Sequence, residues 1–299
     1  MVKVFILGAT GFIGRPAALQ LVSTGHQVYG LARNAAKAKS LAAEEVIPVL
    51  GDALQTESWI HLVKEVDVII NALGGSVDIK EVSEITLEAV SKAAIEIRPS
   101  SAPKLAYIYT SGTWVHGEDR ENLKTDTSPI TNPNEVVAWR PIHEQKVIKD
   151  GNVNGIVVRP SLLYGKSASL LADLFRGAST GTVNWPGTPG GRLATIHTDD
   201  LAVLYQLVAE KAPVLGGLIF DASNEQTEST DDFLNKLVKV SGAKGPYQYT
   251  QPRNAYEQAL GSTTLLRPNL ARALLGWQPR KASLTDGLTT YFAAFKANL

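Results

Sequence analysis

The glycine-spaced run Gly8-Ala9-Thr10-Gly11-Phe12-Ile13-Gly14 constrains this chain more than any other feature. It follows an unbroken apolar segment at residues 2–7, which predicts a strand buried on both faces of a parallel sheet. Residues 12–24 then show helical periodicity and end before Gly25. Glycines here let the backbone turn sharply and approach a phosphate, while a helix N-terminus attracts the negative charge. The run therefore predicts a dinucleotide-binding loop; the alternative is an ordinary tight turn between strand and helix.

Short apolar segments and helical patterns alternate through the first half of the chain. Such alternation predicts a parallel sheet with right-handed crossovers, and we expect an α/β fold with a Rossmann-type doubly wound parallel sheet. The predicted strands are residues 28–32, 46–50, 66–71, 105–110 and 155–158. The predicted helices are residues 35–43, 56–63, 82–97 and 135–149, and the polar segment 117–133 is predicted to be a loop.

The second half is less regular and predicts a smaller C-terminal substrate lobe. Helices are predicted at residues 170–176, 200–210, 229–240, 271–275 and 284–295, and an extended segment at 182–186. We expect residues 1–165 to form the dinucleotide-binding Rossmann domain and residues 166–299 to be mainly substrate-binding, with a strand near 217–221 returning to the sheet. The carboxylate pair Asp199-Asp200 opens a predicted helix, so we interpret it as a cap and dipole partner.

Composition and charge narrow the expected partners. Lys plus Arg and Asp plus Glu are equal at 29 each, which argues against a general nucleic-acid binder. No segment has the unbroken apolar length of a membrane span, and the apolar start of the chain breaks at Gly8, unlike a signal peptide. There is no cysteine, and the five histidines show no metal-ligand spacing. We therefore expect a cytoplasmic protein with a small-molecule substrate and no metal.

The residue after the second predicted strand indicates which dinucleotide is bound. An acidic residue there would hold the adenosine ribose hydroxyls of NAD, but the chain has Arg33. An arginine can bind a 2′-phosphate, with Lys37 or Lys39 adding charge, so we predict NADP rather than NAD. The alternative is a solvated arginine at a strand end. Asp52 ends the third strand, either as an acceptor for the adenine amino group or as a turn residue.

Further motifs extend over nearly the whole chain: Gly51-Asp52, Tyr109-Thr110-Ser111, Arg159-Pro160-Ser161-Leu162-Leu163-Tyr164-Gly165, Ile196-His197-Thr198-Asp199-Asp200-Leu201-Ala202 and Leu275-Gly276-Trp277. Together with the glycine run they resemble the short-chain dehydrogenase/reductase superfamily, in its atypical or extended, NAD-dependent epimerase/dehydratase-like branch. The resemblance implies that the Arg-Pro segment passes beside the nicotinamide, that Leu-Gly-Trp belongs to the substrate lobe, and that a homodimer forms through the helices flanking the fifth strand.

The catalytic signature of this superfamily is missing. Its members supply a Ser or Thr and a Tyr four residues before a Lys, and no Tyr-x-x-x-Lys follows the fifth predicted strand. Aligning Glu144-Gln145 with the usual Glu-Gln places Arg140 at the lysine position and Val136 at the tyrosine position. Valine cannot move a proton, and arginine stays charged. Gly112 falls at the usual Ser position, flanked by other hydroxyl residues.

We therefore predict a rebuilt site whose catalytic candidates face a cleft: Ser111, Thr113, His116 and Arg140. His116 is the preferred proton carrier because an ordinary histidine titrates near neutral pH. The predicted function is an NADP(H)-dependent oxidoreductase of a small carbonyl, enone or sugar-like substrate. The alternatives are a non-catalytic redox sensor and an epimerase or dehydratase with retained cofactor. The predicted cofactor-binding residues are Gly8, Thr10, Gly11, Phe12, Ile13, Gly14, Arg33, Asp52, Ala53, Ala72, Leu73, Gly74, Thr110, Arg140, Pro160, Ser161 and Leu162.

Overall fold

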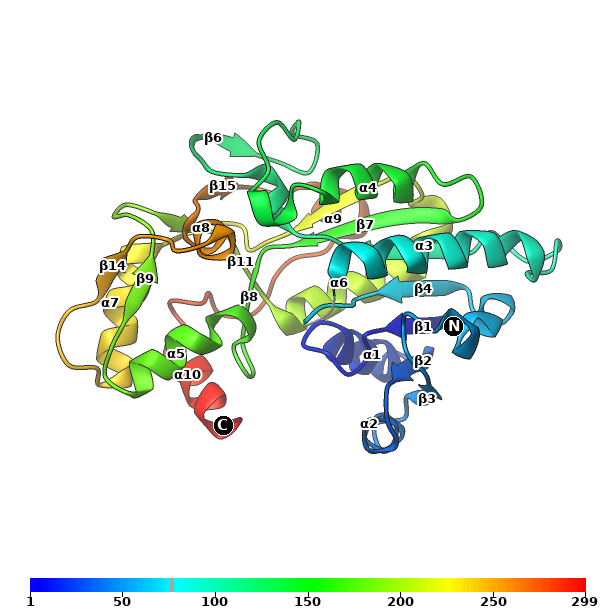
Figure 1. Cartoon of the computed structure of the whole chain (residues 1–299), viewed down its shortest axis with the longest axis horizontal. Helices are drawn as coiled ribbons and strands as arrows, with labels where there is room; N and C mark the ends of the chain where they lie inside the picture. The colour runs from blue at the N-terminus through cyan, green and yellow to red at the C-terminus, as the bar shows by residue number, and fades with distance from the viewer. Residues whose placement is uncertain (76–77) are drawn as a thin grey trace. The chain divides into compact units, whose positions relative to one another are not determined.

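Seven strands form one parallel sheet within the residues that the computed structural model describes, 1–75 and 78–299. The order across the sheet is β12-β7-β5-β4-β1-β2-β3 (Figure 1). This is the doubly wound Rossmann-type arrangement, so the predicted fold class is confirmed. The strand expected near residues 217–221 joins the edge of the sheet. The strands are β1 (Lys3–Leu7), β2 (Gln27–Ala32), β3 (Ile47–Leu50), β4 (Val68–Asn71), β5 (Ala106–Thr110), β7 (Asn154–Pro160) and β12 (Ile219–Ala222).

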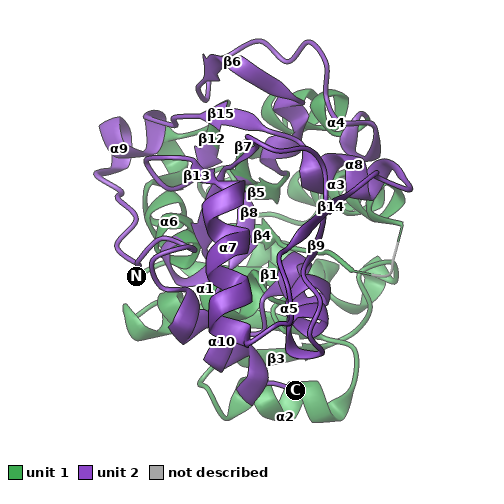
Figure 2. Cartoon of the chain, turned by 90° about the vertical axis from the view of Figure 1, so that its left-hand side faces the viewer, with its two compact units in different colours: residues 1–111, 139–159, 201–220 green, residues 112–138, 160–200, 221–299 purple. Residues whose placement is uncertain are grey.

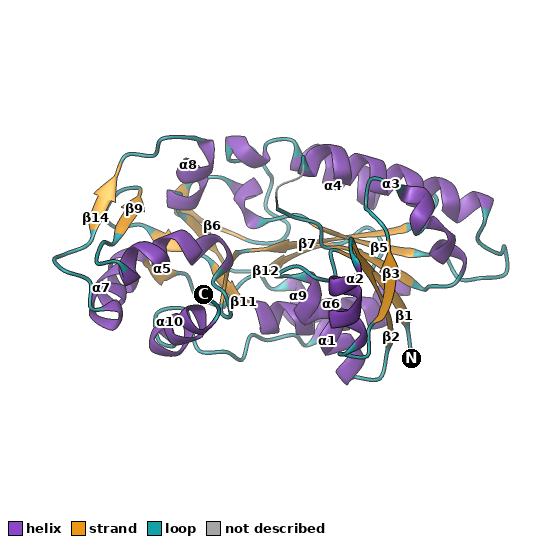
Figure 3. Cartoon of the chain, turned by 60° about the horizontal axis from the view of Figure 1, so that its bottom comes forward, coloured by secondary structure: helices purple, strands orange, loops and turns teal. Residues whose placement is uncertain are grey.

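Helices cover both faces of this sheet. Helices α3 and α4 lie on one face and α1 and α6 on the other (Figures 1 and 3), and Gln20 of α1 donates to Gln206 of α6. The sheet can therefore be apolar on both sides, as β1 and β4 are. The helices of this part are α1 (Gly14–Ser23), α2 (Ala35–Ala42), η1 (Thr56–Ser58), η2 (Ile60–Lys64), α3 (Ile79–Glu96), α4 (Arg140–Ile148), α6 (Thr198–Lys211) and η6 (Ala212–Val214).

Several predicted helices have different bounds. The first begins at Gly14 rather than residue 12, because the Gly11 amide first closes a turn onto the Gly8 carbonyl. Residues 56–63 form two short 3-10 helices, interrupted at Trp59, whose backbone leaves the helical region. Helix α3 starts three residues earlier than predicted. There the Asp78 side chain accepts from two backbone amides and caps it.

The chain divides into two compact units (Figure 2). Unit 1 comprises Met1–Ser111, Trp139–Arg159 and Leu201–Phe220, and unit 2 comprises Gly112–Ala138, Pro160–Asp200 and Asp221–Leu299. We expected one boundary near residue 165, whereas the chain passes between the units several times. The substrate-binding role given to residues 166–299 stays a prediction.

Unit 2 is held together by short strand pairs and an aromatic core. Strand pairs β8–β11, β9–β14 and β6–β15 are parallel, and β10–β13 is antiparallel. The core includes Phe175, Trp185, Phe233, Phe292 and Phe295. The elements are η3 (Thr113–His116), β6 (Asp119–Lys124), η4 (Glu135–Val137), β8 (Leu162–Tyr164), η5 (Ser169–Leu171), α5 (Ala172–Ser179), β9 (Asn184–Pro186), β10 (Arg192–Leu193), β11 (Thr195–His197), β13 (Glu228–Ser229), α7 (Thr230–Ser241), β14 (Gln248–Thr250), α8 (Ala255–Gly261), β15 (Thr264–Leu266), α9 (Leu270–Leu275) and α10 (Leu288–Ala297).

Two predictions for this region were wrong. Residues 117–133 were expected to be a loop but contain β6. This strand pairs with β15 from much later in the chain, with Asp119 opposite Thr264. The predicted helix at residues 135–149 is two elements, η4 and α4, because Pro141 and Trp139 mark a separate helix start at Arg140.

Candidate functional site

The glycine loop after β1 is close-packed against the end of β4. Gly8 has φ +87°, and a Cβ there would lie 2.5 Å from the Ala72 carbonyl oxygen. A Cβ on Gly14 would lie 2.2 Å from the Gly8 carbonyl oxygen. Both positions therefore require glycine, because the obstructing atoms belong to the backbone and cannot turn aside. Phe12 and Ile13 precede the first residue of α1, at the helix end whose positive dipole favours an anion.

A cavity of about 250 Å³ in unit 1 opens beside this loop. Residues at the ends of β1, β2, β3 and β4 line it. The carboxyl ends of these parallel strands therefore meet at one place, as the sequence predicted. Predicted residues that it brings together are Gly8, Thr10, Gly11, Arg33, Asp52, Ala53, Ala72, Leu73 and Gly74. Lining residues absent from the predicted set are Leu31, Lys37, Leu54, Gly75, Ile79 and Val82.

Two cations mark the β2 side of the cavity. Arg33 is exposed, and in the described part of the chain no carboxylate pairs with its guanidinium. Lys37 lies in the first turn of α2, where the Asn34 side chain accepts from the Lys37 amide and caps the helix. Lys39, the other lysine considered, is not among the lining residues. Asp52 is a turn residue, because its carboxylate accepts from the Leu54 amide at 3.0 Å. It also lines the cavity, and its role as an acceptor for the adenine amino group stays a prediction.

The wall at the end of β4 is fixed by a buried amide. Asn71 donates through Nδ2 to Thr86 Oγ1 at 2.9 Å and to the Tyr107 hydroxyl at 2.8 Å, and its Oδ1 accepts from the Leu73 amide. Burial raises the pKa of Tyr107 to about 12, so this hydroxyl stays neutral at physiological pH. Asn71 was not among the predicted site residues, although a polar residue ending an apolar strand could have marked it.

Arg140 and the end of β5 meet in unit 1, beyond the lining of that cavity. Arg140 Nη1 donates to the Tyr109 hydroxyl at 2.8 Å and to the Thr110 carbonyl at 3.1 Å. The Thr110 hydroxyl is 2.6 Å from the Tyr205 hydroxyl, on the opposite face of the strand. Ser111 Oγ is buried and has no hydrogen-bond partner in the described structure.

We expected His116 to face a cleft, but the residue is buried. Its side chain and that of Asp221 have no exposed surface, and His116 Nε2 lies 2.8 Å from Asp221 Oδ2. The Asp221 amide donates to Asp126 Oδ1, which anchors the carboxylate. Within the described residues His116 Nδ1 has no partner. Thr113 is also buried in this unit. The imidazole is therefore part of a buried pair, and its catalytic role stays a prediction.

Motifs from the second half of the sequence contact one another in unit 2. Strand β8, from the Arg-Pro motif, pairs with β11, and a Cβ on Gly165 would lie 2.3 Å from His197 Nε2. The Trp277 indole donates to the Asp200 carbonyl at 2.9 Å. Within the Arg-Pro motif, the Ser161 amide donates to the Ala222 carbonyl.

The remaining predicted cofactor contacts from this motif, Pro160 and Leu162, are buried in the same unit. They do not line the unit 1 cavity, and their contact with a nicotinamide stays a prediction.

The carboxylate pair Asp199-Asp200 lies in the first turn of α6, as predicted, but does more than favour the helix dipole. Asp199 forms ion pairs with Lys166 at 3.1 Å and Lys281 at 3.0 Å. The Asp200 carboxylate accepts from the backbone amides of Arg280 and Lys281, both at 3.0 Å. These contacts tie the chain after Trp277 to the start of the helix, so the pair is structural.

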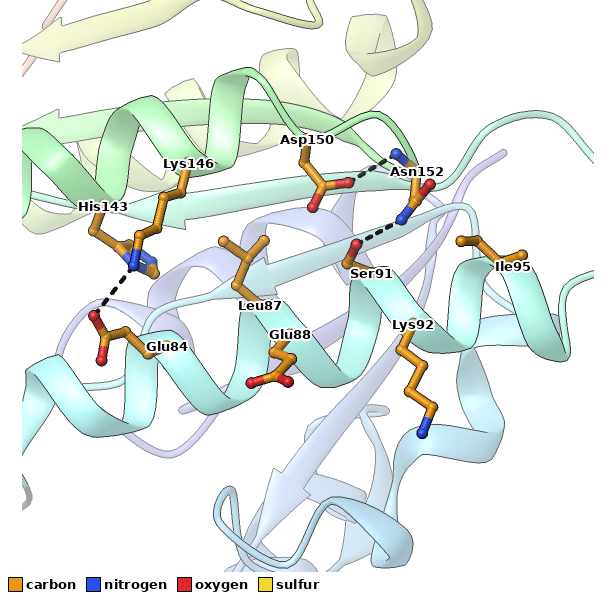
Figure 4. A pocket seen from close by; sticks show the side chains of 10 residues that line it. All are labelled: Glu84, Leu87, Glu88, Ser91, Lys92, Ile95, His143, Lys146, Asp150 and Asn152. Atoms are coloured by element: carbon orange, nitrogen blue, oxygen red, sulfur yellow. Dashed lines mark hydrogen bonds and ion pairs between the residues drawn. The ribbon is translucent and has the colours of Figure 1, made fainter.

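A second hollow in unit 1 lies between α3 and α4 (Figure 4). Its volume is about 640 Å³, and charged side chains of both signs surround Leu87 and Ile95. His143 lines it, with both ring nitrogens lacking partners in the described residues, and burial lowers the pKa of His143 to about 4. A neutral imidazole follows at physiological pH. Lys146 reaches across the hollow to Glu84, at 3.5 Å.

Residues 1–75 and 78–299 contain neither a metal-binding cluster nor a membrane-spanning helix. No group of three or more His, Asp or Glu side chains is placed to hold a metal ion. None of the described helices combines the length and apolar character needed to cross a bilayer.

The comparison with known families agrees with the geometry of the glycine loop and its cavity. Residues 8–166, more than half of the chain, match the family model described as NAD(P)H-binding. The chain belongs to the NAD(P)H-binding family. The resemblance to the extended short-chain dehydrogenase/reductase superfamily agrees with relatives that are named epimerase family proteins, among them one of Bacillus subtilis that is 23% identical over 97% of this chain and 94% of its own.

Relatives of this NAD(P)H-binding protein share most of its length. An uncharacterized protein of Saccharomyces cerevisiae is 26% identical over 97% of this chain and 99% of its own. The 2-alkyl-3-oxoalkanoate reductase of Stenotrophomonas maltophilia is 26% identical over 81% of this chain and 76% of its own. Among solved structures, the dTDP-glucose 4,6-dehydratase of Bacillus anthracis in complex with NAD has a TM-score of 0.81 at 16% identity, covering 100% of this chain and 97% of the other. That likeness concerns the fold.

Proposed function

We propose that this protein is an NADP(H)-dependent reductase of a small carbonyl, enone or sugar-like compound. The observation that carries the proposal is the cationic pair Arg33 and Lys37 at the cavity edge after β2, where an NAD enzyme would present a carboxylate. A phosphate monoester on the adenosine ribose would meet one unpaired guanidinium, one ammonium and the capped N-terminus of α2.

The residues around this cavity fit a dinucleotide. Gly8 and Gly14 let the loop pack closely on the backbone carbonyls of Ala72 and Gly8. Thr10 and Gly11 of the same loop line the cavity, where a pyrophosphate would lie against them. Leu31, Ala53 and Leu54 offer apolar surface to an adenine, with Asp52 as an acceptor for its amino group. Reduced nicotinamide, when bound, supplies a hydride to an electrophilic carbon.

The polar catalytic candidates would interact with the substrate oxygen during the reduction. In a reduction, that oxygen gains negative charge and then a proton, and Ser111, Thr113 and Arg140 are candidates to stabilise the charge. His116 is our candidate for the proton, because Nε2 is held by Asp221 and Nδ1 has no partner among the described residues. The similarity to a named 2-alkyl-3-oxoalkanoate reductase supports reduction over epimerisation or dehydration.

The test is a titration of cofactor-free protein with NADPH and with NADH, followed by nicotinamide fluorescence. We expect NADPH to bind at least tenfold more tightly, and Arg33→Ala to remove most of that preference. Lys39→Ala is the matched control, because it removes the same charge from α2 at a position that does not line the cavity. Equal affinity for both dinucleotides in the wild type would overturn the NADP assignment, and binding of neither would overturn the whole proposal.

We also propose a homodimer through the α3–α4 face. Ile95 of α3 and Ile142 of α4 are exposed by 66% and 67%, and an interface on this face would remove them from water. If two α3 helices cross antiparallel about Glu88, Glu84 of each copy faces Lys92 of the other, because both lie four residues from Glu88. Sedimentation of the wild type should give twice the mass of 32.1 kDa, and Ile142→Glu should give monomers. A monomeric wild type would contradict the proposal.

A further inference from the structure

Arg140 has hydrogen-bond donors that the protein leaves unused. Its Nη1 is bound by the Tyr109 hydroxyl at 2.8 Å and the Thr110 carbonyl at 3.1 Å. In the described residues, no acceptor meets Nε or Nη2. The side chain is half-buried, and neither nitrogen is among the buried polar atoms, so both can be reached by solvent or by a ligand.

Two aromatic residues lie close to this guanidinium. Its central carbon lies 4.9 Å from the centroid of the Trp139 ring and 5.9 Å from that of Tyr109. Tyr109 is itself 1% exposed and belongs to the core beneath α3 and α4. A fork held by a stacked ring and a buried hydroxyl loses little further freedom when it binds an anion.

Ser111 supplies an unsatisfied hydroxyl on the same face of the strand. Its amide donates to the Val158 carbonyl, so the extended pairing of β5 continues to this residue. Side chains two residues apart in a strand point the same way, which places Ser111 on the face where Tyr109 receives Arg140. Ser111 Oγ is buried and, in the described structure, has no partner. A buried hydroxyl of this kind is costly unless a ligand or water completes it.

We propose that Arg140, together with Ser111, binds a carboxylate group of the substrate, a role that replaces for these two residues the stabilisation of the substrate oxygen given above. A carboxylate accepts two parallel bonds from an arginine fork and can accept a third from a hydroxyl. Tyr109 and Trp139 are then positioning residues, since they hold the guanidinium and would not touch the substrate. This inference rests on the proposed function, because it names the substrate class of the same site. Neutral ribose hydroxyls of the dinucleotide are the competing occupant.

Calorimetry with a charged and an uncharged probe tests the carboxylate site. The full-length protein, with and without saturating NADPH, is titrated with 3-hydroxyhexanoate and with its methyl ester. NADPH and a hydroxy acid cannot react, so only binding is measured. We expect the acid to bind at least tenfold more tightly than the ester, and Arg140→Gln to equalise the two. Tyr109→Phe should reduce the preference severalfold while leaving the ester unchanged. Lys149→Gln, a charge-matched control at the end of α4, should retain it.

The outcomes separate this inference from the cofactor proposal. If the acid and the ester bind with equal affinity, or if neither binds, the proposed carboxylate site is overturned, whatever the affinity for NADPH. Arg140→Gln that weakens NADPH binding while keeping the acid preference would overturn it too, and would assign Arg140 to the dinucleotide. Failure of the wild type to bind NADPH, with the acid preference present in cofactor-free protein, would refute only the proposed function.

Discussion

Replacing Gly8 with alanine tests how the dinucleotide loop is built. The loop residue has φ +87°, and the new Cβ would lie 2.5 Å from the Ala72 carbonyl oxygen. The left-handed conformation alone costs a residue with a Cβ about 1–2 kcal/mol. Forcing the backbone of the β4 end aside adds about 1–3 kcal/mol, the usual range for overpacking. We therefore expect Gly8→Ala to lower the free energy of unfolding by about 2–5 kcal/mol.

Gly25 offers a matched control, because its φ is +84° and a Cβ there meets nothing within 4 Å. Gly25→Ala should show the conformational cost of about 1–2 kcal/mol alone. Urea unfolding and NADPH titration of both variants separate the two contributions. The NADPH affinity of Gly25→Ala should match the wild type, while Gly8→Ala should bind at least tenfold more weakly, since Ala72 and Gly8 both line the cavity. Equal stability and equal NADPH affinity for the two variants would refute the close-packing argument.

Three further predictions concern buried polar groups. His116→Ala removes a charged-group hydrogen bond to Asp221 and should destabilise the fold by about 1.5–3 kcal/mol in urea unfolding; no change would contradict the buried pair. Glu144→Gln removes the charge that faces Arg159 at 2.6 Å and should cost about 3 kcal/mol, measured in the same way; a loss below about 1 kcal/mol would exclude a strong pairing. Because burial lowers the pKa of His143 to about 4, its folded state excludes the imidazolium. Stability should thus fall as the pH drops from about 6.5 toward 4, and His143→Leu should flatten this fall in unfolding curves at pH 7.5 and 5; an unaltered slope would disprove it.

The Rossmann half was predictable because its signals are local. The apolar strands and the helical periods between them identify most of the central sheet, and glycine spacing identifies the loop at Gly8. Arg33 could be placed at the cavity because the carboxyl ends of parallel strands converge. The starts of two helices were predicted at the wrong residue. The Asp78 cap makes α3 begin earlier than predicted, and the turn from Gly8 to Gly11 makes α1 begin later.

Unit 2 was less predictable because its contacts join distant segments. Strand β6 carries the polar sequence DRENLK, which has no apolar alternation, and only its partner β15 makes it a strand. The burial of His116 depends on Asp221, 105 residues away, and nothing near His116 in the sequence announces that partner. In unit 1, the contacts of Arg140 likewise depend on a distant residue, because Tyr109 lies 31 residues away along the chain.

The repeated passage of the chain between its two units bears on how the protein is synthesised and dissected. Unit 1 includes residues 201–220, so a ribosome must translate about three quarters of the message before the dinucleotide-binding unit has all its parts. A fragment ending at residue 165 would lack α6, and with it the Tyr205 hydroxyl that meets Thr110. Expression of that fragment should yield a chaperone-bound or proteolysed product. Circular permutants that keep residues 1–220 contiguous would retain every segment of unit 1.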